Sequence, residues 1–114
     1  IICPLRWDDK QHVIIDDLVK RLDLGAIVVA DAGLGTINSA VLTIEHLEFR
    51  HIPVKGVILN NFHPGDLMEE DNLKMIEKIT GVPVIATVKK GDTELDIDAD
   101  FLAGLYCTPF EDEK

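Results

Sequence analysis

Basic residues are scarce in this 114-residue chain: 11 Lys and Arg stand against 21 Asp and Glu, and the formal net charge is −10. Proteins that bind DNA or RNA need a basic face for the phosphates, so we do not expect nucleic acid as a partner. A single nucleotide or another small anion remains compatible with this charge, because a helix N-terminus and a few lysines can hold it locally.

Long apolar runs and cysteines are scarce as well. No stretch approaches the roughly 20 apolar residues that a membrane-spanning helix needs, and no charged and apolar leader opens the sequence. We therefore expect a cytoplasmic protein without a membrane partner. Cys3 and Cys107 match no metal-binding or redox spacing, so we expect reduced thiols with a structural role.

Apolar residues suffice for one hydrophobic core, since they make up 46% of the chain. A length of 114 residues is too short for two domains, so we expect a single domain over residues 1–114. The sequence opens with IICP, as if in the middle of a strand, and its first residue is Ile rather than Met. We interpret the chain as a portion of a longer protein.

Three short runs rich in Val and Ile predict strands, at residues 26–30, 54–59 and 82–88. They are almost continuously apolar, as is typical of parallel strands that are buried on both faces. Segments with helical periodicity alternate with them, at residues 12–25, 37–48, 69–81 and 98–106. In the second of these the apolar face comprises Ile37, Val41, Ile44 and Leu47. The alternation predicts an α/β fold, a doubly wound parallel sheet flanked by helices.

Ligands of such sheets bind beyond the carboxyl ends of the strands, where three loops are expected. The first loop, residues 31–38, contains Gly33 and Gly35, whose bare backbone lets N–H groups approach a ligand. The helix that follows would favour a carboxylate or a phosphate at its N-terminus. The same loop also suits a plain helix start in which Thr36 or Asn38 is the N-cap. No Gly-Lys-Ser/Thr follows, so this is not a Walker A loop.

The second loop begins at Asn60, at the end of the second predicted strand. Its carboxamide could pair with the edge of a nucleotide base, because it donates and accepts hydrogen bonds at once. The alternative is that Asn60 and Asn61 only satisfy the backbone of a turn. We expect His63 to be an exposed loop residue rather than a metal ligand, since it has no partner at metal-binding spacing.

The third loop follows the last predicted strand and carries Lys89, Lys90 and Gly91. These residues could approach a phosphate or a ribose, although lysines in so acidic a chain could equally be solvated. The sequence shows no metal-binding spacing, and we expect no catalytic residue and no metal ligand in this chain.

A receiver domain of two-component signalling is a weak alternative, because such domains are α/β sheets of similar length. Asp8-Asp9, Asp31 and Lys89 imitate its acidic pair, its phosphorylated Asp and its Lys. However, Pro4 interrupts the apolar strand that should precede the acidic pair, and Asp31 follows the second strand rather than the third. The imitation is poor.

The segments GAIVVADAGLGTINSAVLTIEHL, IPVKGVILNNF and TGVPVIATV resemble the carboxy-terminal half of dethiobiotin synthetase, in the same order and spacing. The Leu-Gly-Thr-Ile-Asn run at residues 34–38 is the most specific part, and the similarity covers residues 1–91. The resemblance implies a homodimeric enzyme with a P-loop NTPase-like fold that uses ATP and Mg²⁺. Such an enzyme closes a cyclic urea on 7,8-diaminononanoate with CO₂, in the synthesis of biotin.

The resemblance also implies the roles of two sets of residues. The part that holds the carboxylate tail of the diamine, across the dimer interface, comprises Leu34, Gly35, Thr36, Ile37 and Asn38. The part that contacts the nucleotide comprises Asn60, which resembles the adenine-reading Asn of the family, and Lys89, Lys90 and Gly91, which fall where its backbone passes the adenine.

The chain departs from the family in five respects. The phosphate-binding loop with its Lys and Thr is absent, as are the substrate lysine and the magnesium carboxylates, so we expect no catalysis by this chain alone. The family has a basic residue near Gly33 and a Pro near Lys89, and this chain has neither. The competing interpretation is therefore a non-catalytic α/β module that binds a ligand or dimerises.

Overall fold

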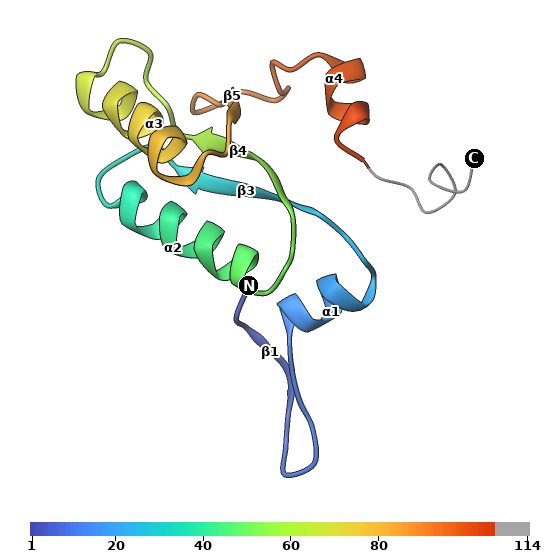
Figure 1. Ribbon diagram of the computed structural model, residues 1–114. Helices are drawn as coiled ribbons and strands as arrows, with labels where there is room; N and C mark the ends of the chain where they lie inside the picture. The colour runs from blue at the N-terminus through green and yellow to red at the C-terminus, as the bar shows by residue number, and fades with distance from the viewer. Residues whose placement is uncertain (107–114) are drawn as a thin grey trace.

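A computed structural model describes residues 1–106 and contains two separate sheets (Figure 1). The first is an antiparallel hairpin of β1 (Pro4–Trp7) and β2 (His12–Ile14). The second is parallel, in the order β3-β4-β5, and comprises β3 (Ala26–Asp31), β4 (Val54–Asn60) and β5 (Val84–Thr87). The helices are α1 (Ile15–Arg21), α2 (Thr36–Phe49), α3 (Leu67–Thr80) and α4 (Ala99–Gly104).

The α/β fold with a parallel sheet and flanking helices is thus confirmed. Helix α2 connects β3 to β4 and α3 connects β4 to β5, and both lie on the same face of the sheet (Figure 1). This placement follows from right-handed crossovers that run in one direction across the sheet. The core lies between the sheet and these two helices, and its most buried aliphatic side chains are Ile44, Leu47, Val57, Leu59 and Ile76.

The expectation that the strands are buried on both faces is wrong for β3. Val28 points into the core and is 8% exposed, whereas Val29 on the opposite face is 65% exposed. The helices packed on this sheet both cover the Val28 face, so the strand alternates between a buried and an open side. The apolar run could not reveal this, because Ile27 and Val29 are as hydrophobic as their buried neighbour.

The predicted helix at residues 12–25 ends earlier than expected, since α1 stops at Arg21 rather than at Gly25. It is also wrong in its first turn, because residues 12–14 form β2 instead. The reason is the tight turn that precedes them, in which the Asp8 carboxylate accepts hydrogen bonds from the backbone N–H groups of Lys10 and Gln11 at 2.8 and 2.7 Å. Helix α1 then begins at Ile15, and Asp17 accepts from the Ile14 backbone N–H at 2.9 Å.

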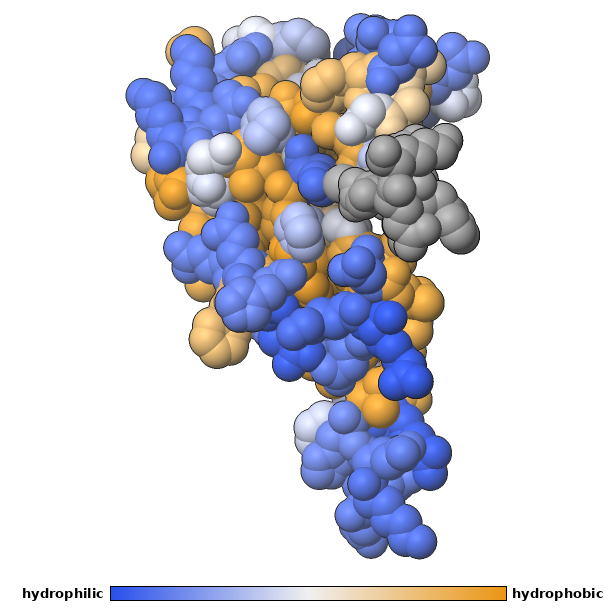
Figure 2. Space-filling model, turned by 45° about the vertical axis from the view of Figure 1, so that its right-hand side comes forward, coloured by the Kyte–Doolittle hydropathy of each residue, from blue (hydrophilic) through white to orange (hydrophobic). Residues whose placement is uncertain are grey.

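The hairpin extends away from the sheet, and on it the Trp7 ring stacks on His12 with 4.0 Å between the ring centroids (Figure 1). The radius of gyration is 15.9 Å. A compact chain of this length would have a radius of roughly 13 Å. Figure 2 shows a mostly hydrophilic hairpin below a body in which apolar surface is visible between polar patches. The described chain is therefore more extended than a self-contained globular domain.

A buried carboxylate joins α1 to α2. Asp16 is fully buried, and its Oδ2 lies 2.7 Å from Nε2 of His46 and 3.3 Å from Nε of Arg50. The Arg50 guanidinium also forms an ion pair with Asp17. Two consecutive acids of the short helix α1 are thus held by His46 in α2 and by Arg50, the C-cap residue of that helix, which fixes the hairpin and α1 to the sheet layer.

Helix α3 ends at Gly81 as the sequence predicts, but it begins at Leu67, two residues before the predicted start at Glu69. The Asp66 side chain caps it by accepting a hydrogen bond from the Glu69 backbone N–H at 3.0 Å, and Gly81 ends it in the left-handed conformation, with φ of 71°. None of the helices between residues 1 and 106 is long and apolar enough to span a membrane. Cys3 is a free thiol, as the sequence predicts, but it is exposed, which does not fit a structural role; Cys107 lies outside the described residues.

Candidate ligand-binding groove at the carboxyl edge of the sheet

The loop after β3 is held to the loop after β4 by one carboxylate. Asp31 accepts a hydrogen bond from the Asn61 side chain at 2.9 Å and one from the Gly33 backbone N–H at 3.0 Å. Both bonds lower the pKa of the Asp31 carboxyl, and the bond from Asn61 has the larger effect. The Ala32 backbone N–H donates to the Asn60 carbonyl at 2.8 Å and so continues the pairing of the strands. Asn61 thus ties two loops together instead of satisfying only its own turn.

The N-terminus of α2 has no side-chain cap. The N-cap residue is Gly35, with φ of 88°, and no side chain of the described residues caps the helix there. The expectation that Thr36 or Asn38 is the N-cap is therefore wrong, since both lie inside the helix. The left-handed conformation favours glycine at this position. An uncapped N-terminus presents backbone N–H groups and the positive end of the helix dipole, which together suit a bound anion.

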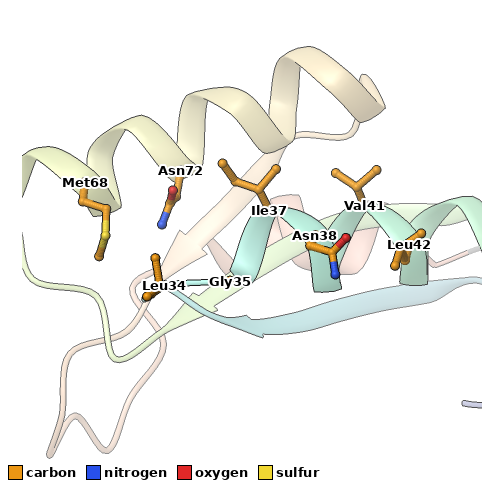
Figure 3. Close-up of a pocket in the computed structure, with 8 residues that line it drawn as sticks. All are labelled: Leu34, Gly35, Ile37, Asn38, Val41, Leu42, Met68 and Asn72. Carbon is orange, nitrogen blue, oxygen red and sulfur yellow. The ribbon is translucent and has the colours of Figure 1, made fainter.

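A groove of about 500 Å³ begins at this helix end and runs between α2 and α3 (Figure 3). The residues that line it are Leu34, Gly35, Ile37, Asn38, Val41, Leu42, Met68 and Asn72. Its walls are mostly apolar, and one carboxamide lies on each helix, Asn38 on α2 and Asn72 on α3. The volume and the lining suit a small molecule with an aliphatic body and one polar end.

Helix α2 is rotated relative to the apolar face that its sequence predicts. Its buried side is formed by Thr36, Ala40, Ile44 and Leu47. Ile37 and Val41 are only partly buried and line the groove instead. The rotation separates Thr36 from its four predicted companions: Leu34, Gly35, Ile37 and Asn38 reach the groove, whereas Thr36 is 4% exposed. Thr36 lines a second hollow of about 320 Å³ along β3, together with Leu34 and Gly35. Its hydroxyl oxygen is buried and has no hydrogen-bond partner among the described residues.

The sequence did not single out Met68 and Asn72, which form the α3 side of the groove. A signal for Asn72 was present, because it is a polar residue on the buried side of a helix, four positions before the core residue Ile76. Buried carboxamides need hydrogen-bond partners, so a buried Asn72 implies that its side chain bonds another part of the chain.

The residues expected to contact a nucleotide lie at the same edge of the sheet. Asn60 ends β4, and the backbone N–H of Val88, which follows β5, donates to the Leu59 carbonyl at 2.8 Å. The next residues form a tight turn in which Asp92 accepts from the Lys89 backbone N–H at 2.9 Å and Gly91 has φ of 90°. Asn60, Lys89, Lys90 and Gly91 are exposed, so they are available to a ligand on this edge.

His63 is exposed, as the sequence predicts, and it has a partner that the sequence did not reveal. Its Nδ1 lies 3.0 Å from Oε1 of Glu69, and its backbone N–H donates to Oε2 of the same carboxylate at 2.6 Å. The side chains are 70% and 7% exposed, so a nearly buried carboxylate fixes an exposed imidazole. Among residues 1–106 no group of three or more His, Cys, Asp or Glu could hold a metal ion.

The bond to Glu69 raises the pKa of His63, which makes the contribution of this pair to stability depend on pH. A raised pKa stabilises the folded chain fully below the unfolded value, about 6.5, and this stabilisation is lost as the pH rises through the folded pKa. We expect His63→Gln to lower Tm more at pH 5.5 than at pH 9, by a small amount because water screens the exposed ring. His51→Asn, at another exposed His, serves as the control. Equal losses of Tm for His63→Gln at both pH values would contradict the pairing.

Comparison with known protein families assigns this chain to one of them. Residues 9–93, well over half of the chain, match the model of a family described as "AAA domain". The chain belongs to this AAA-domain family. The match includes α2, α3 and the groove between them, as well as the edge of the sheet that carries Asn60 and Lys89.

Curated relatives of this AAA-domain chain carry the name ATP-dependent dethiobiotin synthetase. The protein of that name from Brachyspira hyodysenteriae is 50% identical over 96 residues, which are 84% of this chain and 43% of the relative. Those from Clostridium novyi and Clostridium botulinum (strain 657) are each 38% identical, over 79% and 93% of this chain. The resemblance seen in the sequence is thus confirmed, and the chain spans less than half the length of these relatives.

Proposed function

We propose that this AAA-domain chain forms part of an ATP-dependent dethiobiotin synthetase and contributes the groove that holds the tail of 7,8-diaminononanoate. The observation that carries the proposal is the uncapped N-terminus of α2 at the mouth of an apolar groove. The diamine has the complementary shape, an aliphatic chain that ends in a carboxylate. The relatives that share the name support the same reading, whereas they favour neither a receiver domain nor a non-catalytic module.

In this proposal the residues of the groove bind and orient the substrate. The carboxylate accepts hydrogen bonds from the first N–H groups of α2 and from the Asn38 side chain. The aliphatic chain packs between Ile37, Val41 and Met68, which exclude water from it. The two amines are then directed out of the groove. A fixed orientation is what this reaction needs, because a carbamate on one amine must meet the other amine to close the ring.

The nucleotide belongs to the edge formed by Asn60 and Lys89–Gly91. The Asn60 carboxamide is suited to reading a base by donating and accepting together. ATP supplies the phosphoryl group that converts the carbamate oxygen into a leaving group. We propose Mg²⁺ as the ion that accompanies ATP. The described residues include no group of three or more His, Cys, Asp or Glu that could hold a metal ion, so none of them has a metal-binding role in this proposal.

We further propose a cytoplasmic homodimer with the diamine bound across the interface, and we treat residues 1–114 as one unit of the fold. Exposed apolar side chains along α2 support a protein contact on this helix, since Leu42 and Phe49 are 57% and 80% exposed. A second copy that covers α2 would also enclose the groove, which begins at the same helix.

Calorimetric titration of the 114-residue chain with 7,8-diaminononanoate tests the proposal. We expect binding, and we expect 2,3-diaminononane, in which a methyl group replaces the carboxylate, to bind at least tenfold more weakly. Asn38→Ala removes one hydrogen-bond donor to the carboxylate, so it should weaken binding of the acid by about tenfold. Ser39→Ala changes a neighbour that does not line the groove and should leave the affinity unchanged. Absence of binding, or equal affinities for the two ligands, would refute the site.

A further inference from the structure

Asn72 connects α3 to the loop that precedes α2. Its side chain is buried, with 7% of the residue exposed, and it lies in the middle of a helix whose other buried residues pack in the core. Its Nδ2 donates hydrogen bonds to the carbonyl oxygens of Ala32 at 3.0 Å and of Gly33 at 3.3 Å. One carboxamide therefore satisfies two consecutive carbonyl groups that are about 40 residues away in the chain.

We propose that Asn72 is a positioning residue that holds the loop of the groove against α3 and thereby sets the affinity of the groove for its anionic ligand. This inference rests on the proposed function. Asn72 lines the groove beside Met68 (Figure 3). Among the described residues that line the groove, it is the one whose side chain donates hydrogen bonds to the loop after β3, at Ala32 and Gly33.

The hydrogen bond from Asn72 to the Gly33 carbonyl affects ligand binding because this carbonyl lies at the start of α2. That carbonyl also accepts the backbone N–H of Thr36 at 3.3 Å, which is the first bond of the turn leading into α2. Gly35, which directly precedes Thr36, is the N-cap of α2; it has φ of 88°, and no side chain within residues 1–106 caps the helix there. The direction of the first N–H groups of α2 thus depends on a carbonyl that α3 holds in place.

The chemistry at position 72 calls for a donor and not merely for a side chain of suitable size. Ala32 is fully buried, so loss of the donor leaves its carbonyl without this bond inside the protein. Leu has the same branched arrangement of heavy atoms as Asn but no hydrogen-bond donor. In Asn72→Leu the loop should move away from α3, and the groove should widen between Gly35 and Met68.

The test compares three variants of the 114-residue chain by calorimetry with 7,8-diaminononanoate and by hydrogen exchange of the backbone amides. Asn72→Leu should weaken binding about tenfold and speed the exchange of the amides at residues 33–36, with the β3–β4 ladder unchanged. Asn72→Gln, which keeps the donor, should restore most of the affinity. Asp71→Leu, at the exposed neighbouring position, should change neither quantity.

The outcomes separate this inference from the proposed function. If the unaltered chain binds the acid and Asn72→Leu binds it equally well while folded, the inference is overturned. A loss of affinity that follows only the loss of global stability, measured by urea unfolding, also overturns it, because a purely structural role would give that result. If the unaltered chain does not bind the acid, the proposed function fails and the ligand part of this inference fails with it. The exchange of the loop amides then decides whether Asn72 positions the loop.

Discussion

Ile44→Ala should lower the free energy of unfolding by about 3 kcal/mol, within the range found for large-to-small changes at buried aliphatic sites. Ile44 is fully buried on the side of α2 that faces the sheet, between Ala40 and Leu47. Its side chain is part of the core cluster that includes Val28 of β3 and Leu59 of β4. Truncation removes apolar contacts and leaves a cavity that two strands and a helix cannot close without moving together.

Urea unfolding followed by circular dichroism measures this loss. Leu42→Ala is the matched control, because it lies half a turn earlier on the same helix and its side chain is 57% exposed. We expect the control to cost less than about 1 kcal/mol. If both variants lost the same stability, the rotation of α2 that turns Ile44 toward the sheet and Leu42 away from it would be wrong. A loss of about 3 kcal/mol is large for a chain of this size, since whole domains have only about 5–15 kcal/mol.

Arg50→Met should have the second largest effect, a loss of about 2 kcal/mol in the free energy of unfolding. The substitution keeps an unbranched side chain but removes the guanidinium whose Nε lies 3.3 Å from the fully buried Asp16 carboxylate. A buried charge that loses its partner is expensive, because it cannot regain its hydration. The expected loss is below the roughly 3–5 kcal/mol found for broken buried pairs, because His46 still contacts Asp16 and the Arg50 side chain is already 31% exposed.

A double-variant comparison isolates this interaction. Asp16→Asn removes the charge from the buried site, so Arg50→Met should cost much less in the presence of Asp16→Asn than alone. The two substitutions would then be strongly coupled in their effect on the urea midpoint. Additive effects would show instead that Arg50 stabilises the chain through its exposed contact with Asp17 or through packing.

The sequence predicted those parts of the fold whose causes are local. The strands β3, β4 and β5 each follow from a short apolar run, and α3 follows from an acidic first turn and a closing glycine. The hairpin was missed because its formation depends on how Asp8 organises a turn, while residues 12–14 fit the periodicity of the helix that follows. A three-residue difference in where the helix begins separates the predicted structure from the observed one.

The site was predicted in part for the same reason. Glycines at a strand-to-helix turn have a local signature, so the Gly33–Gly35 region was singled out from the sequence. The partners that shape it come from far along the chain: Asn61 reaches Asp31 and Asn72 reaches Ala32 over 30 and 40 positions. The rotation of α2, which separates Thr36 from the groove, is set by packing against β3 and α3 and has no counterpart in the pattern of apolar residues.

Because one side of β3 is open, the measured stability of this chain depends on what covers that side. Anything that covers Ile27 and Val29 in the folded state, and does not bind the unfolded chain, adds its binding free energy to that of folding. A transition temperature recorded at one protein concentration then describes the chain together with its surroundings. The same sequence has a different apparent stability in dilute solution and in an assembly, although no residue has changed.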